Sequence, residues 1–338
     1  MQHDLLIRGG RLYDPEKPSF STVDGAVAGD RIVRVAPSPL ENEANEFIDA
    51  GSSGALNFDA FREFVLEKSR VNLFAFLNIS LIGQCFEAQI PGVPVIHEYD
   101  DLRLVHVEQT VRCLVENPDF LVGVKVRAHR GLTNLTPIHA ALETAEATGL
   151  PLMIHTSSPP PSARQYFDLL RPGDIVTHLY HPGPGAVVDR HGVVRPEYRD
   201  ARERGVLMET GFARWHTDFE IMRKAFDRGF WPDIIGTDVT TTNIDDLVYD
   251  LLYTAGKFLA LGMPLEDVLT AMTLAPARAM SRTELAQVRE GGAADLSVLE
   301  VREEETRFRD YYGHTMDGNL RIVCRHLVSR GSLIPPGR

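Results

Sequence analysis

Apolar runs of strand length alternate with longer amphipathic segments through the middle of the chain. The runs that predict strands are residues 71–80, 120–128, 151–156, 174–180, 205–211 and 233–240. Between them, helical patterns predict helices over residues 138–149, 163–173 and 245–262, the first of which ends in a glycine, as helices often do. This alternation of strands and helices is typical of a parallel sheet covered by helices.

The two ends of the chain have a different pattern. Residues 1–50 and 283–338 contain short strand-like runs that are broken by glycine, proline and aspartate. We therefore expect one small β-sandwich module built from both termini. The long middle, residues 51–282, would form the second domain.

The middle segment predicts an α/β fold, specifically a TIM-type (β/α) barrel that lacks its first two strands. A closed barrel of this type has eight strands, and the pattern supplies six of them. The alternative is an open doubly wound sheet, but no GxGxxG phosphate-binding turn occurs where that fold requires it. A barrel without two strands would expose two sheet edges or close into a smaller barrel, which puts its stability in question.

Composition narrows the partners and the compartment. The formal net charge of −12 argues against non-specific binding to nucleic acid or anionic membranes, both of which need basic patches. The opening MQHDLLIRGG has no basic-then-apolar leader, and no apolar run is long enough to span a bilayer. The three cysteines, Cys85, Cys113 and Cys324, are scattered without CxxC spacing, which predicts a reducing, cytoplasmic setting. We expect a small-molecule substrate, and association into homo-oligomers stays open.

Lys125 is the first candidate for chemistry. Strand alternation over 120–128 places Val122, Val124 and Val126 on one face and Lys125 with Arg127 on the other. With helices outside, Lys125 would point into the barrel mouth, where a buried lysine must be paired, shifted in pKa or chemically modified. A structural salt bridge, a carbamylated lysine that bridges two metals and a catalytic amine are the three interpretations.

His155, His178 and Asp238 follow Lys125 at the ends of successive predicted strands. A lone histidine at a strand end is more often a core residue than a ligand, but two on consecutive strands beside an inward lysine favour a metal site. Asp238 alone could cap the next helix, because the residues after it are rich in capping types. The ordered series Lys, His, His, Asp predicts a metal site, with Lys125, His155, His178 and Asp238 as ligands.

Several stretches resemble the amidohydrolase superfamily, in particular its deacetylase-like and dihydroorotase-like metallohydrolases. They are DLLIRGGRLYDP, GSSGALNFDAF (51–61), GVKVR (123–127), MIHT (153–156), GDIVTHLYH (173–181), IIGTDVT (234–240), TLAPARAM (273–280) and GGAADLSVLEV (291–301). The resemblance covers nearly the whole chain. It implies one or two divalent ions, usually zinc, with Lys125 as a carbamylated bridging ligand. His155 and His178 would be ligands to one metal, and Asp238 the acid–base aspartate.

The chain departs from this family at the first ligand pair. None of its twelve histidines belongs to a His-x-His motif, which the family carries at the end of the first barrel strand. The strand EFIDA (46–50), assigned here to the terminal module, runs directly into GSSGA, as if a strand, a helix and a second strand of about 40 to 50 residues had been removed. One metal site is therefore plausible and a second is doubtful.

The predicted function is metal-dependent hydrolysis of a non-peptide C–N or ester bond in a small acylated substrate, most like an N-acyl amino acid. A cyclic amide, as in dihydroorotase, is the closest alternative, and a non-catalytic homologue with at most one metal is another. Arg127 would bind a substrate carboxylate or form a structural ion pair. Tyr180 and His181 would line the pocket, although the HPGPG turn that follows could alone explain them. The stretch METGFARWHTDFE (208–220) departs from what the resemblance implies for a loop that shapes the pocket.

Overall fold

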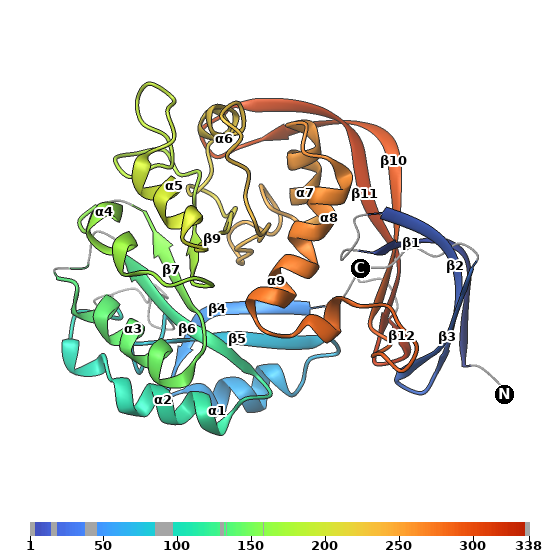
Figure 1. Cartoon of the computed structure of the whole chain (residues 1–338), viewed down its shortest axis with the longest axis horizontal. Coiled ribbons are helices and arrows are strands. Elements are labelled where there is room, and N and C mark those ends of the chain that lie inside the picture. Colours follow the sequence, from blue (N-terminus) through green and yellow to red (C-terminus); the bar gives the residue numbers. More distant parts are fainter. Residues whose placement is uncertain are drawn as a thin grey trace.

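A computed structural model describes residues 4–14, 19–37, 46–84, 97–128, 132, 134–157 and 159–334. Its centre is a parallel sheet in which each strand pairs with its neighbour in chain order (Figure 1). The strands are β4 (Glu46–Gly54), β5 (Asn72–Asn78), β6 (Leu121–Ala128), β7 (Leu152–Thr156), β8 (Ile175–Thr177) and β9 (Leu207–Met208). The parallel α/β class predicted from the apolar pattern is thereby confirmed.

Five of the six predicted strands correspond to β5 through β9. The sixth, residues 233–240, is reduced to a parallel bridge between Glu209 and Ile234. Backbone hydrogen bonds continue there, from Thr210 N–H to the Ile234 carbonyl and from Phe212 N–H to the Gly236 carbonyl. Side chains add to them, since the carboxylate of Asp233 accepts from the N–H of Met208 and the hydroxyl of Thr210 donates to the carbonyl of Gly236. The prediction of a regular strand over this segment is therefore wrong.

Strand β4 corrects the assignment of EFIDA to the terminal module. Residues 46–50 pair in parallel with β5, and β4 continues as far as Gly54, which lies opposite Asn78. Strand β4 thus covers the edge of β5 that does not pair with β6. The rest of the predicted division into domains stays a prediction.

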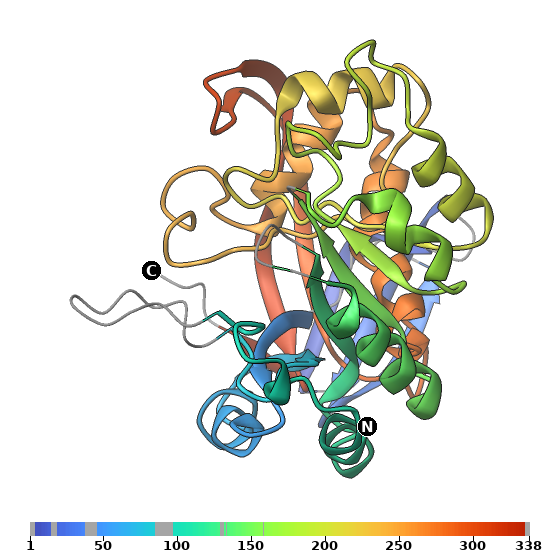
Figure 2. The same cartoon turned by 90° about the vertical axis from the view of Figure 1, so that its left-hand side faces the viewer.

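Helices cover the outer face of the sheet. The two nearest the middle strands are α2 (Val107–Glu116), which contacts β5 and β6, and α3 (Thr136–Thr148), which contacts β6 and β7 (Figures 1 and 2). Gly149, at a φ of 69°, ends α3 as the sequence predicted. The remaining helices are α1 (Phe58–Phe61), α4 (Ala163–Tyr166), α5 (Pro196–Glu203), α6 (Phe219–Phe226), α7 (Leu251–Ala260), α8 (Leu265–Met272) and α9 (Leu274–Ala279). They do not all lie on this face, since Met280 at the end of α9 packs with Phe74 and Phe76 on the opposite face. None of the described helices is both long and apolar enough to cross a membrane.

Each end of the chain forms a three-stranded antiparallel sheet. The first contains β1 (Leu5–Asp14), β2 (Ser19–Ala28) and β3 (Arg31–Pro37), and the second β10 (Leu296–Arg309), β11 (Thr315–Ser329) and β12 (Ser332–Ile334). Backbone hydrogen bonds join them, from Ala294 N–H to the Asp30 carbonyl and from Ile32 N–H to the Gly292 carbonyl. Their shared buried cluster consists of Val27, Ile32, Ala294, Leu296 and Val328. Cys113 and Cys324 are free thiols, and Cys85 lies outside the described residues.

Candidate metal centre

The face of the parallel sheet that is turned away from α2 and α3 is layered. Its deeper layer is apolar and comprises Phe74, Phe76, Val122, Met153, Ile175 and Met280. Above it, at the carboxyl ends of the strands, lies a layer of polar side chains. Strand register sets these side by side: Asn78 opposite Lys125, Arg127 opposite His155, and His155 opposite Thr177. The sheet therefore gathers its polar groups where enzymes with this kind of sheet keep their active sites.

A β-bulge in β6 changes the face on which Val122 lies and leaves Lys125 on its predicted face. Register shifts between β5 and β6 because Ala75 pairs with Leu121 and Phe76 with Gly123, leaving Val122 as the extra residue. Val122 consequently joins the apolar layer of the inner face, while Val124 and Val126 pack on the helix side. The predicted alternation is thus wrong for Val122 and right for the other two valines. Lys125 is 3% exposed, and its charge acts on His155, His178, Asp238 and Glu209.

His155 and His178 lie against one another, with ring centroids 4.2 Å apart. Burial, followed by the positive charges of neighbouring histidines and of Lys125, holds the pKa of His155 well below its usual value. Burial and the charge of His216 act in the same way on His178, whose pKa is also well below normal. Both imidazoles are therefore neutral at pH 7, which is the form that binds a metal.

A hydrogen bond to the backbone decides which nitrogen of His178 is available as a ligand. His178 has a φ of 70°, and its Nδ1 lies 2.8 Å from the carbonyl oxygen of Gly211. A carbonyl only accepts, so Nδ1 carries the proton and Nε2 is left with a free lone pair. A hydrogen bond of this kind is the usual way in which a protein orients a histidine ligand.

Asp238 completes the predicted series from the loop after Ile235. Its backbone is also left-handed, with a φ of 46°, and the side chain of Asn243 donates to its carbonyl oxygen at 2.9 Å. Burial by itself raises the pKa of Asp238, but the neighbouring His216 and the charges of His178 and Lys125 lower it to about 2. The carboxylate is therefore ionised at neutral pH and can serve as a ligand or accept a proton.

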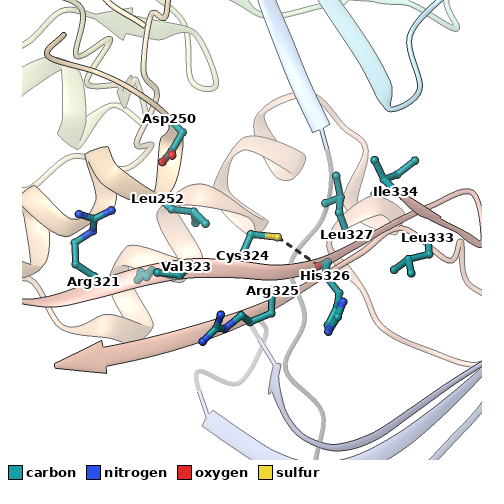
Figure 3. Close-up of a pocket in the computed structure, with 11 residues that line it drawn as sticks. Asp250, Leu252, Arg321, Val323, Cys324, Arg325, His326, Leu327, Leu333 and Ile334 are labelled. Carbon is teal, nitrogen blue, oxygen red and sulfur yellow. Dashed lines mark hydrogen bonds between the residues drawn. The ribbon is translucent and has the colours of Figure 1, made fainter. Parts of the chain in front are cut away.

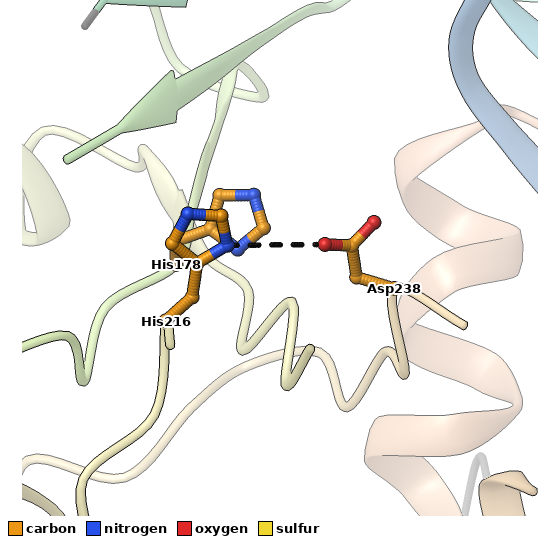
Figure 4. Close-up of side chains that lie close together, drawn as sticks. All are labelled: His178, His216 and Asp238. Carbon is orange, nitrogen blue, oxygen red and sulfur yellow. Dashed lines mark ion pairs between the residues drawn. The ribbon is translucent and has the colours of Figure 1, made fainter. Parts of the chain in front are cut away.

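His216 is the member that the sequence did not reveal. Its ring lies 4.0 Å from that of His178 and 4.9 Å from that of His155, and its Nδ1 is 3.9 Å from a carboxylate oxygen of Asp238. His178, His216 and Asp238 each offer a ligand atom within 4.8 Å of the other two (Figure 4). His216 lies in a loop, where no periodicity marks its direction. The only signal was that the stretch 208–220 departs from the expected pattern.

This trio fits a metal ion on the chemistry of its atoms. Two imidazole nitrogens and a carboxylate oxygen are a common catalytic zinc set, which leaves one position for water or substrate. Among the described residues, the buried Nδ1 of His216 has no hydrogen-bond partner. A buried nitrogen without a partner is costly, and coordination would satisfy it. The structure thus brings three histidines, Lys125 and Asp238 together, while the roles assigned to them stay predictions.

Glu209 is a buried acid at the same strand ends. Burial raises its pKa, while hydrogen bonds from Thr177 and from the N–H of Gly211 and the charge of Lys125 act in the opposite direction. The carboxylate accepts from Gly211 N–H at 2.8 Å. Gly211 in turn meets His178 through its carbonyl, so Glu209 supports the orientation of His178 through one glycine.

We expect Gly211→Ala to destabilise the protein by about 2–4 kcal/mol, because it combines strain at positive φ with overpacking. Gly211 has a φ of 45°, and a Cβ there would lie 2.3 Å from Thr177 Oγ1 and 2.5 Å from His178 Nδ1. Gly229→Ala is the matched control, since Gly229 has a φ of 70° and nothing within 4 Å of the added carbon. Urea unfolding gives the loss of unfolding free energy for each variant, and the difference between the two losses measures the cost of the clash. Equal losses would show that the site tolerates the added methyl.

In the metal-free protein, the three buried histidines of this region are expected to remove about 3 kcal/mol of unfolding free energy between pH 6.5 and 5.5. Burial lowers the pKa of His155, His178 and His181, that of His181 to about 4, so the unfolded chain takes up protons in this range that the folded chain does not. Stability then falls with falling pH, by about 1 kcal/mol for each histidine over this unit. Denaturant titrations at several pH values measure the slope, and His155→Gln should reduce it by about a third. An unchanged slope in that variant would contradict the prediction.

The three residues predicted to bind substrate have different surroundings. Arg127 forms an ion pair with Glu98, with Nη2 2.6 Å from Oε2, and the Glu98 side chain is fully buried. This geometry favours the structural alternative for Arg127. Tyr180 is fully buried and lies edge-on to Phe226 of α6, with ring centroids 5.7 Å apart. Its place in the pocket wall stays a prediction, and its buried hydroxyl has no hydrogen-bond partner among the described residues.

His181 lies closer to the centre than Tyr180 does. It is 4% exposed, and the charge of His216 helps to lower its pKa. Its Nε2 has no partner among the described residues. A neutral imidazole with an unsatisfied nitrogen beside the trio is suited to hydrogen-bond a substrate.

A separate hollow lies on the terminal sheet, away from the histidine cluster. It is bordered by residues of β11 and β12 and by the start of α7, including Asp250, Cys324, His326 and Ile334 (Figure 3). Cys324 donates to the backbone carbonyl of His326 at 3.3 Å. None of the residues predicted for chemistry lines this hollow, so the carboxyl ends of the parallel strands hold the candidate site.

Known proteins similar to this chain are hydrolytic enzymes. A deacetylase of Brucella anthropi is 27% identical over 313 residues, which are 91% of this chain and 76% of that protein. A deacetylase of Agrobacterium fabrum is 29% identical over 319 residues, 91% of this chain and 77% of that one. No family model matches the chain.

Solved structures agree with these relatives. A dihydroorotase superposes with a TM-score of 0.84 at 25% identity, covering 97% of each chain. An adenine deaminase at 23% identity has a TM-score of 0.88 and covers 99% of this chain and 100% of its own, which shows the same fold. The chain is thus similar in sequence to deacetylases and in fold to a dihydroorotase, and both findings support an enzyme. They agree with the resemblance to the amidohydrolase superfamily that the sequence implied.

Proposed function

We propose that this chain is a metal-dependent deacetylase that hydrolyses the acyl bond of a small N-acylated or O-acylated substrate. The observation that supports the proposal most directly is the convergence of His178, His216 and Asp238 within 4.8 Å of one another. We infer that His216 supplies, from a loop, a ligand that relatives take from the absent His-x-His pair. In fold terms we propose a (β/α) barrel without its first two strands, next to a sandwich formed by both termini.

A bound divalent ion, which we expect to be zinc, would polarise the scissile carbonyl and lower the pKa of a water molecule. Asp238 would accept the proton of that water and return it to the leaving nitrogen or oxygen. His178 would stay fixed through its bond to Gly211. His181 would hydrogen-bond the substrate from the side of His216.

Lys125 can act in two ways in this proposal. As a carbamate it would add a carboxylate-like ligand, and with His155 it could hold a second ion. As a free ammonium it would balance the negative charges of Glu209 and Asp238, with which it already interacts. Mass spectrometry of the intact protein in bicarbonate, read for the roughly 44 Da of an added CO2, separates the carbamate from the amine.

Two relatives named deacetylases support acyl hydrolysis as the leading substrate class. The likeness to a dihydroorotase supports cyclic-amide hydrolysis as the second. We further propose that the protein acts on a free small molecule in a reducing, cytoplasmic compartment, without nucleic acid or membrane.

The decisive experiment combines metal analysis with two assays. The purified chain is loaded with zinc, freed of excess metal and tested for release of acetate from N-acetyl amino acids and for opening of dihydroorotate. We expect about one zinc per chain and turnover of the acetylated substrates. Less than a tenth of a metal per chain, with no turnover of either class, would leave only a non-catalytic homologue.

A further inference from the structure

The tip of the β10–β11 hairpin reaches the loop that carries His216. Figure 1 shows the hairpin extending from the terminal sheet over α7 toward α6. At its turn, residues 310–314 meet residues 212–218, which connect the end of the parallel sheet to α6. The hairpin thus joins the terminal module to the loop with the candidate ligand.

Asp310 is the centre of this contact. Its side chain is fully buried, and its two oxygens accept hydrogen bonds at 2.9–3.0 Å from four donors: the backbone N–H of Phe219, Tyr312 and His314 and Nδ1 of His314. His314 also lies 3.3 Å from Asp218, whose side chain caps α6 two residues after His216. These hydrogen bonds occupy both carboxylate oxygens of Asp310, which thereby joins the hairpin tip to the start of α6.

Aromatic side chains extend the contact toward His216. The hydroxyl of Tyr312 donates to the backbone carbonyl of Trp215 at 2.7 Å. The ring of Tyr311 lies edge-on to Trp215, with centroids 6.2 Å apart, and the guanidinium of Arg214 lies 5.2 Å from the same ring. The hairpin therefore contacts Arg214 and Trp215, the two residues just before His216. His216 itself faces Asp238.

The hairpin itself is firmly seated on α7. Phe308 of β10 is fully buried, and it fits there because Gly256 and Gly318 have no side chain; a Cβ would lie 3.0 Å from its ring at the first and 2.8 Å at the second. Lys257 of α7 places its ammonium 3.7 Å from the ring centroid of Phe212, at the start of the His216 loop. Both sides of the contact thus rest on the same helix.

We propose that the tip of the β10–β11 hairpin, residues 310–314, is a positioning element of the metal centre that holds the loop 212–218 so that His216 faces His178 and Asp238. This inference rests on the proposed function. A loop ligand needs such support, because Ala213 adopts a φ of 45° and no strand pairing fixes the residues after it. Asp310, Tyr312 and His314 would act through His216 without touching substrate.

The test measures metal binding in Tyr312→Phe and Asp310→Asn, with Tyr311→Phe as the matched control. Tyr312→Phe deletes one hydrogen bond to the loop and should weaken zinc affinity about 3–10-fold. Asp310→Asn should weaken it about 10–100-fold, in the range of other groups that orient a ligand. Tyr311→Phe keeps the ring against Trp215, so we expect wild-type affinity. Zinc competition against a chromophoric chelator gives the affinities.

Two further measurements separate positioning from a general loss of structure. The visible spectrum of the cobalt-loaded protein should change in Tyr312→Phe while its unfolding free energy stays near that of the wild type. Amide exchange in the metal-free protein should speed up over residues 212–218. A wild type that binds zinc, with both variants binding it equally well, would overturn the inference and leave the proposed function standing. A wild type that binds no zinc would remove both.

Discussion

Asp238→Asn is expected to lower kcat/KM for the acetylated substrate by about 10³-fold or more, because it removes both an anionic ligand and the proton acceptor. The carboxylate is ionised well below neutral pH, with a pKa of about 2 that follows from His216, His178 and Lys125 outweighing burial. Asparagine has nearly the same shape but neither charge nor basicity. Steady-state hydrolysis of the zinc-loaded variant measures the loss.

The matched control for Asp238 is Asp245→Asn in the same loop. Asp245 is exposed, so its replacement should leave kcat/KM within about twofold of the wild type. Activity of Asp238→Asn above a tenth of the wild-type value would contradict the role given to Asp238. In that case Glu209, the buried acid on which the charge of Asp238 acts, would be the next residue to replace.

The sequence predicted most of the sheet because buried parallel strands leave a strong signal. Runs such as 120–128 and 151–156 are almost continuously apolar, and they fold as β6 and β7 within one or two residues of their predicted limits. Residues 46–50 were misassigned for a physical reason. A strand that is free to pair with either of two sheets carries the same pattern in both cases, and only the uncovered edge of β5 decides between them.

In the candidate site too, the sequence pattern predicts the face on which a residue lies but not what depends on neighbouring elements. Lys125 and His155 were predictable because strand alternation sets the face on which they lie. Val122 broke the alternation because a bulge depends on the neighbouring strand, here on the ring of Phe76, which lies where a Cβ of Gly123 would be. His216 was missed because its position depends on a hairpin almost a hundred residues later.

His216→Ala is expected to weaken zinc binding by at least about 10²-fold and to reduce the metal content after gel filtration to a small fraction of one per chain. The variant leaves only His178 and Asp238 of the close trio, and two ligands hold zinc far less well than three. Without metal, the same variant should be almost as stable as the wild type, because the metal-free wild type contains a buried His216 Nδ1 with no partner among the described residues. Removing that ring therefore deletes an unsatisfied group, and the metal-free unfolding free energy should fall by less than about 1 kcal/mol.

His139→Ala is the matched control for His216, because His139 is exposed on α3, on the outer side of the sheet. It should bind zinc as the wild type does. His216→Cys offers a second ligand type from the same loop, and partial recovery of affinity relative to alanine would show that coordination, and not ring packing against His155 and His178, is what the position provides. Zinc affinity of His216→Ala equal to the wild type would mean that the ion is held by Lys125, His155, His178 and Asp238, the set that the sequence alone predicted.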